Sequence, residues 1–194
     1  SLSAIAGVAN TGSDVNWCGH HFSQANWYAY GRLAWNYDLT SEGIADEWIR
    51  MTWSNDSEIR TELASMMMPS REAAINYMTP LGLSFTIDTN NSEPRHYHAN
   101  PAMRNDEYLQ ADSDGIGVDR SSTGSDAASQ YLSPLSESWD SLATCPEEYL
   151  LWFHHVDWDY IMKSGRTLWD ELCFKYYDGV QHVTDMKATW DSLS

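Results

Sequence analysis

The segment 1–36 carries the pattern that most restricts the fold of this chain. Small and apolar residues over 2–10 are followed by a loop with Asn, Asp, Trp and His side chains, which ends at His21. An aromatic stretch with helical spacing then covers residues 23–36. Strand, polar loop and helix in this order form one βα unit of a (β/α)8 barrel, in which the loop after each strand faces the active site. The pattern therefore predicts that the chain begins with a barrel unit.

Charge and cysteine content exclude several classes of partner. The chain has 28 acidic and 11 basic residues among 194, which gives a net charge of −17. A surface of this sign repels nucleic acid and anionic membranes, so we expect neither as a partner. No apolar run reaches the length of about 18 residues that a membrane span needs. Cys18, Cys145 and Cys173 lack Cys-x-x-Cys spacing and predict a reducing, cytoplasmic location, with secretion left open for a fragment.

Helical periodicity dominates the rest of the chain. The spacing of apolar residues predicts a mainly α fold, with one long irregular loop over residues 84–123, where no helical period is found. Pro69 is expected to interrupt a helix, because proline removes a backbone hydrogen bond, and a second helical piece follows over 70–78. The expected helix caps are Ser41, Asn55, Ser125, Thr144 and Ser164. Apolar stripes are expected at Ile44, Trp48 and Met51 and along 168–190.

Aromatic and histidine residues mark the stretches that could carry chemistry. Ten Trp and eleven Tyr side chains suit either an aromatic core or the flat faces of bound sugars. The stretch 152–160 mixes aromatic rings, imidazoles and carboxylates, and it forms either a packed corner between helices or a wall of a carbohydrate site. The histidines lack the spacing of a zinc motif, so no metal or cofactor is expected. The Asp112-x-Asp114-Gly115 sequence resembles a calcium loop only weakly, because the spacing and the final Glu do not fit.

Four carboxylates are candidates for catalysis if the chain is active on its own. A glycosidase needs two carboxyl groups on opposite sides of a cleft. The candidates are Asp14, Glu147, Asp157 and Asp159. For Glu147 a position in the first turn of a helix offers a simpler explanation, because a carboxylate there stabilises the helix dipole.

Five blocks of this sequence closely resemble the C-terminal part of the glycoside hydrolase family 67 α-glucuronidases. The blocks are 7–35, 41–53, 77–83, 112–117 and 149–177. The resemblance implies an enzyme that cleaves the α-1,2 bond between 4-O-methyl-glucuronic acid and xylose with inversion. It also implies that 1–36 form the last barrel strand, active-site loop and helix, and that 37–194 form a C-terminal helical domain. In the family this domain packs on the barrel, lines part of the pocket and contributes to dimerisation.

The resemblance implies a module that is not catalytic alone, because the family's catalytic carboxylates lie upstream and match no position here. The expected partners are xylo-oligosaccharide or glucuronoxylan fragments, the barrel domain and a homodimer partner. The residues expected to bind substrate are Asn10, Trp17, His20, His96, Tyr97, Arg120, His155 and Trp158. Two departures from the family are the absence of a Trp after His96-Tyr97 and the presence of Pro69. The alternatives are a stand-alone xylo-oligosaccharide-binding protein and a small independent xylan-degrading hydrolase.

Overall fold

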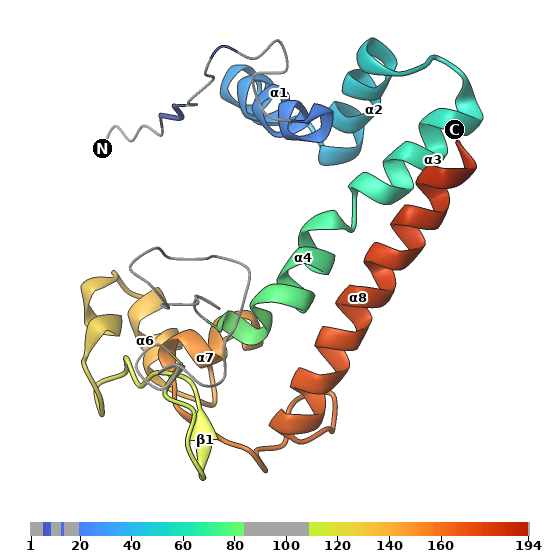
Figure 1. Cartoon of the computed structure of the whole chain (residues 1–194). Coiled ribbons are helices and arrows are strands. Elements are labelled where there is room, and N and C mark those ends of the chain that lie inside the picture. The colour runs from blue at the N-terminus through green and yellow to red at the C-terminus, as the bar shows by residue number, and fades with distance from the viewer. Residues whose placement is uncertain (1–5, 9–12, 14–19, 84–108, 194) are drawn as a thin grey trace. The chain divides into compact units, whose positions relative to one another are not determined.

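The computed structural model describes residues 6–8, 13, 20–83 and 109–193. This part of the chain is mainly α-helical, which confirms the expected fold class (Figure 1). The expected first strand, 2–10, lies largely outside the described residues. The chain divides into two compact units, Ser1–Ser70 with Met186–Ser194 and Arg71–Asp185. The boundary after residue 36 that the resemblance implies stays a prediction.

The first unit is built from three helices and the end of a fourth. They are α1 (His21–Trp35), α2 (Ser41–Thr52), α3 (Ser57–Met67) and the last residues of α8 (Leu168–Ser192). Two expected caps are wrong by one residue. Thr40, not Ser41, caps α2, because its Oγ1 accepts from the Gly43 N–H at 3.2 Å. Asp56, not Asn55, caps α3 by accepting from the Glu58 and Ile59 N–H groups at 2.9 and 3.2 Å.

The core of the first unit is small and rich in aromatic rings. Its buried members are Ala25, Trp48, Ile49, Leu63 and Met66. The stripe expected on α2 is correct at Ile44 and Trp48 but wrong at Met51, which is 64% exposed. The buried face of α2 instead consists of two adjacent pairs, 44–45 and 48–49, one turn apart. These two pairs form the buried face of α2, and Met51 lies outside it.

The second unit combines short helices with a two-stranded antiparallel sheet. Its elements are α4 (Ser70–Met78), η1 (Pro80–Gly82), β1 (Gly115–Ile116), η3 (Ala127–Gln130), α6 (Leu135–Asp140), η4 (Glu147–Tyr149), α7 (Leu150–Phe153), β2 (Val156–Asp157) and most of α8. The expected break at Pro69 is confirmed, since α3 ends at Met67 and α4 begins at Ser70. Strands β1 and β2 are antiparallel, with Gly115 opposite Asp157.

Aliphatic and aromatic side chains from the short elements form the core of the second unit. Its buried members are Leu81, Leu83, Ile116, Ala128, Cys145, Leu150, Leu151, Phe153, Val156, Met162, Leu168 and Leu172. The caps expected at Ser125 and Thr144 are wrong, because neither η3 nor η4 has a side-chain cap. Ser164 does not cap α8 either. Instead Thr167 Oγ1 accepts from the Asp170 N–H at 3.2 Å, and Ser164 Oγ donates to Glu171.

Within the second unit, α8 packs against α4 at a glycine (Figure 1). A Cβ atom on Gly179 would lie 2.5 Å from the Tyr77 backbone nitrogen, so the helices approach there at backbone distance. The expected apolar stripe of α8 is buried at Leu168 and Leu172 but 57% exposed at Val180. No helix in the described ranges is long and apolar enough to cross a membrane.

Candidate functional site

The candidate site of the second unit is organised by Asp112, just before β1. Its Oδ1 accepts hydrogen bonds from the N–H groups of Asp114 and Gly115 at 2.8 and 2.9 Å, and its own N–H donates to the Gly115 carbonyl at 3.0 Å. Asp residues favour such turns because the side chain bonds to the backbone two or three residues later. These bonds fix the carboxylate, and the two backbone donors are the main reason why the pKa of Asp112 lies below its usual range.

His155 faces this carboxylate from the segment before β2. Its Nδ1 lies 2.9 Å from the Gly117 carbonyl oxygen, and its Nε2 lies 3.6 Å from Asp112 Oδ1. A carbonyl can only accept, so Nδ1 carries the ring proton in the neutral form. The pair thus links the β1 loop to the chain before β2.

Trp158 is fixed by the same aspartate. Its indole Nε1 donates to the Asp112 carbonyl oxygen at 3.0 Å, and its ring meets Trp169 edge to face, with centroids 5.5 Å apart. The backbone N–H of Trp158 donates to the Asp114 carbonyl at 3.0 Å. The structure therefore brings two expected substrate residues to Asp112. His155 faces its side-chain carboxylate, and Trp158 is bonded to its main-chain carbonyl.

Arg120 makes structural contacts with α7. Its backbone N–H donates to the Phe153 carbonyl at 2.8 Å, its guanidinium donates to the Trp152 carbonyl, and its Cζ lies 3.9 Å from the centre of the Trp152 ring. Burial lowers the pKa of the guanidinium. These contacts hold the 118–121 segment on α7, and a role of Arg120 in substrate binding stays a prediction.

Two further polar residues near α7 were not among the sequence-based candidates. Asp119 accepts from the Ser121 hydroxyl at 2.6 Å and from the Thr123 hydroxyl at 2.8 Å. His154 is 6% exposed, and no described residue pairs with its Nε2 atom. Burial lowers the pKa of His154, although Asp119 is one of the charges that act in the opposite direction. His154 is therefore a neutral core residue at neutral pH.

An open hollow adjoins the Trp158 ring. It is lined by Ser113, Asp114, Asp157, Trp158 and Asp159 and has a volume of about 360 Å³. Two of the carboxylate candidates, Asp157 and Asp159, thus line the same hollow, and both side chains are exposed. Glu147, the third described carboxylate candidate, does not line this hollow. Its Oε1 accepts from the Lys163 backbone N–H at 2.7 Å, which ties η4 to the turn before α8.

The remaining expected site residues lie elsewhere in the chain. His20 belongs to the first unit and caps α1, with its Nδ1 accepting from the Ser23 N–H at 3.3 Å. The other expected residues, Asn10, Asp14, Trp17, His96 and Tyr97, lie outside the described residues. Among residues that are described, no group of three His, Cys, Asp or Glu side chains is arranged to hold a metal ion.

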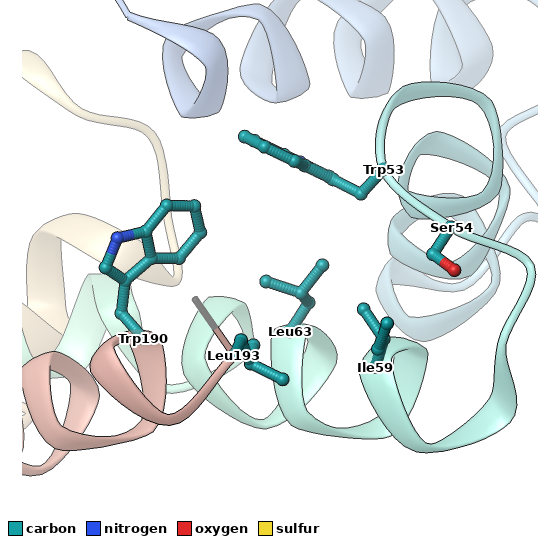
Figure 2. Close-up of a pocket in the computed structure, with 6 residues that line it drawn as sticks. All are labelled: Trp53, Ser54, Ile59, Leu63, Trp190 and Leu193. Atoms are coloured by element: carbon teal, nitrogen blue, oxygen red, sulfur yellow. The ribbon is translucent and has the colours of Figure 1, made fainter.

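The first unit contains a second, apolar hollow (Figure 2). It has a volume of about 260 Å³ and is lined by Trp53, Ser54, Ile59, Leu63, Trp190 and Leu193. Trp53 and Trp190 meet edge to face with centroids 5.5 Å apart, and Figure 2 shows these two rings on different sides of Leu63. One hydroxyl among apolar side chains offers few partners for a polar substrate. The hollow beside Trp158 is therefore the better candidate for recognising a polyol.

Comparisons with known proteins identify the family of the chain. The family model described as "Glycosyl hydrolase family 67 C-terminus" matches residues 18–194. The chain is 34% identical to the probable alpha-glucuronidase A of Aspergillus oryzae and 35% identical to the alpha-glucuronidase of Hypocrea jecorina, in each case over 99% of its own length. It spans only 23% of the length of each of these relatives. On this evidence the chain belongs to glycosyl hydrolase family 67 and corresponds to its C-terminal region.

Proposed function

We propose that this chain serves as the C-terminal helical module of an α-glucuronidase that acts on glucuronoxylan fragments. The observation that carries the proposal is the coverage. The alignment includes 99% of this chain and 23% of the length of each of two relatives that are named alpha-glucuronidases. Residues 1–36 would then complete the barrel, and 37–194 would form the helical module. The family's catalytic carboxylates would come from the preceding barrel, so the module alone would not hydrolyse its substrate.

The surface of α1 supports a role as part of a larger enzyme. Trp35 at the end of this helix is 88% exposed, and Tyr30, Leu33 and Tyr37 are also exposed. Several large apolar side chains on α1 and just after it are thus exposed, and exposed apolar surface of this kind often marks a protein–protein contact. The barrel is the partner that we propose for this surface. A second copy of the enzyme is the further partner that the resemblance implies.

The arrangement of the carboxylates favours the module over an independent hydrolase. An inverting glycosidase holds one carboxyl group on each side of the scissile bond, about 6.5–9.5 Å apart. Asp157 and Asp159 line one open hollow and both are exposed, without the apolar surroundings that a general acid needs. Glu147 lies outside this hollow and accepts from the Lys163 backbone N–H. We propose that His155, Trp158 and the Asp112 turn contribute a wall of the sugar pocket when the barrel is present.

The cysteines support a reducing compartment for the enzyme. Cys145 and Cys173, the two cysteines within the described ranges, are free, and burial raises the pKa of the Cys145 thiol to about 11. A thiol with a pKa this high carries little thiolate, which is the reactive form, at neutral pH. We therefore propose a cytoplasmic location for the enzyme of which this chain is part.

A chimera tests the proposed module function. The C-terminal 23% of the Hypocrea jecorina α-glucuronidase is replaced by this chain, and the release of 4-O-methyl-glucuronic acid from aldouronic acids is measured. We expect release by the chimera, and none by this chain alone or by the truncated relative alone. Release of glucuronic acid or xylose by this chain alone would overturn the proposal, as would a folded but inactive chimera.

A further inference from the structure

We propose that the hollow beside Trp158 is a subsite for a neutral sugar ring and that it rejects glucuronic acid. Its assignment to an unsubstituted xylose unit of xylan rests on the proposed function. The feature that suggests a ligand is an open hollow beside an indole that the protein holds in place. The carboxylates around the hollow determine which sugar fits.

The first step is the aromatic wall. Trp158 cannot rotate freely, because its Nε1 is bonded to the Asp112 carbonyl at 3.0 Å and its ring contacts Trp169. Trp169 does not line the hollow, but it meets the Trp158 ring edge to face and so helps to hold it in place. A pyranose ring has an apolar C–H face that packs on such rings, and ligand sites typically combine an apolar wall with a few polar groups.

The second step is the set of hydrogen-bond partners. Asp114, Asp157 and Asp159 contribute carboxylates to the hollow, and Ser113 contributes a hydroxyl. An ionised carboxylate only accepts hydrogen bonds, and a sugar hydroxyl donates one readily. Such charge-assisted bonds are about twice as strong as bonds between neutral groups. The hollow therefore suits a ligand with many hydroxyl groups.

The third step is charge. The lining contains three carboxylates and no Lys or Arg side chain. A uronic acid carries its own carboxylate, which would be repelled by three like charges within one hollow. Proteins that bind a carboxylate usually offer a guanidinium or ammonium group instead. The hollow should therefore bind the neutral backbone of xylan and not its acidic substituent.

The fourth step is rigidity. The lining comes from two segments, the turn before β1 and residues 157–159, and the Trp158 N–H donates to the Asp114 carbonyl between them. Strands β1 and β2 approach so closely that a Cβ atom on Gly115 would lie 2.2 Å from the Val156 carbonyl oxygen. Rigid walls reduce the entropy lost on binding. The hollow is thus preformed and needs no rearrangement to accept a sugar.

The binding experiment compares two ligands. The whole chain is titrated with xylotetraose and with aldotetraouronic acid in calorimetry, and the indole signals are followed by NMR. We expect xylotetraose to bind more tightly and to shift an indole signal that is absent in Trp158→Phe. Equal or tighter binding of the uronic acid would overturn the proposal.

Charge variants keep the proposal testable if the indole variant fails to fold. Asp157 is exposed, so Asp157→Asn and Asp157→Lys should both fold. We expect Asp157→Asn to weaken xylotetraose binding about fivefold, the effect of losing one hydrogen bond, and Asp157→Lys to increase binding of the uronic acid. The matched control is Glu137→Gln, because Glu137 lines an acidic hollow of about 250 Å³ without an aromatic wall. Unchanged binding in both Asp157 variants would overturn the proposal.

A divalent cation is the competing ligand. The same titrations are repeated with Ca²⁺ in place of the sugar. A Ca²⁺ signal that Asp157→Asn abolishes, with no sugar binding, would overturn the proposal in favour of a cation site. The chimera assay separates this proposal from the module function. An active chimera without the sugar preference would refute the subsite alone, whereas an inactive chimera whose module still prefers xylotetraose would refute the module function alone.

Discussion

Gly117 lies where two chain segments meet at backbone distance. A Cβ atom there would lie 2.2 Å from the His154 carbonyl oxygen, and its φ of +104° is unfavourable for any other residue. We expect Gly117→Ala to lower the free energy of unfolding of the second unit by about 3 kcal/mol or more, measured by urea denaturation. Gly165 is the matched control, because its φ is +85° but no atom lies within 4 Å of a Cβ there.

The comparison of these glycine variants separates strain from steric conflict. Gly165→Ala introduces only a left-handed backbone penalty of about 1–2 kcal/mol. Gly115→Ala instead introduces only a steric conflict, because a Cβ atom there would lie 2.2 Å from the Val156 carbonyl oxygen. A Gly117→Ala variant no less stable than Gly165→Ala would show that the segment after β1 and α7 can move apart, which contradicts the rigid hollow.

Glu171 is a buried carboxylate that fixes the turn before α8. It accepts from the Ser164 hydroxyl at 2.7 Å and from Arg166 Nη1 at 2.9 Å. Burial tends to raise the pKa of Glu171, but these two donors and the positive charges of Arg166 and Lys175 outweigh burial and hold it below its ordinary value of 4.5. The stability from this carboxylate is therefore present above about pH 4.5 and is lost as the pH falls through the folded-state pKa.

We expect Glu171→Gln to lower the free energy of unfolding at pH 7 by about 1–3 kcal/mol, because it removes bonds to charged and hydroxyl donors. As the pH falls through the folded-state pKa of Glu171, which lies below 4.5, the variant and the original chain should become similar, since both then carry a neutral group. Thermal unfolding followed by circular dichroism from pH 3 to 7 measures this. Glu72→Gln is the control, because Glu72 pairs with Arg71 on the exposed surface, where a pair contributes little. A constant difference between pH 7 and pH 3 would contradict the assignment.

The candidate site could be predicted only in part at the level of residues. His155 and Trp158 became candidates because an aromatic and acidic stretch is visible in the sequence, and the structure places both beside Asp112. Asp112 was missed as their common partner, since its contacts with them span more than 40 residues and depend on the pairing of β1 with β2. The Asp-x-Asp-Gly spelling was the available signal, and it indicates an Asx turn. The interpretation of Arg120 lacked its contacts with Trp152, which no local pattern reveals.

Helix α3 tests how well a local rule identifies a cap. Asp56 accepts two backbone N–H bonds at the start of α3, whereas the sequence pattern favoured Asn55. We expect Asp56→Ala to lower the free energy of unfolding of the first unit by about 1 kcal/mol, and Asn55→Ala to change it by less than about 0.5 kcal/mol. Urea denaturation followed by circular dichroism measures both. A larger effect of Asn55→Ala would move the cap back to the expected position.

Helices were more predictable than their ends. The ends of α1 lie within two residues of the expected helix over 23–36, and α4 has the expected bounds of 70–78. Both agree because apolar periodicity and Pro69 are local signals. The start of α8 was placed too early at Ser164, since that hydroxyl bonds to the Glu171 side chain instead of a helix N–H. The exposure of Val180 has a different cause. At this position α8 packs against α4 through Gly179, and an apolar-periodicity pattern does not count glycine as a buried residue.

At the scale of the whole molecule, the large exposed side chain of Trp35 at the end of α1 points to a partner. In the proposed enzyme the barrel packs on this helix, so Trp35 should contribute to stability only there. We expect Trp35→Ser to change the free energy of unfolding of the isolated chain by less than about 0.5 kcal/mol, because the side chain is 88% exposed. In the chimera the same change should cost about 2 kcal/mol or more, since burial of a large aromatic side chain is lost.

Differential scanning calorimetry of both proteins measures the difference, with Glu42→Gln on the exposed first turn of α2 as the control. Each variant is measured in the isolated chain and in the chimera. An effect of the substitution on the folding of α1 itself would appear in both proteins, whereas loss of a contact with the barrel would appear only in the chimera. A Trp35→Ser chimera as stable as its parent would mean that α1 does not contact the barrel through this side chain. The module would then have to be held by another surface, and the exposed aromatic end of α1 would need a different partner.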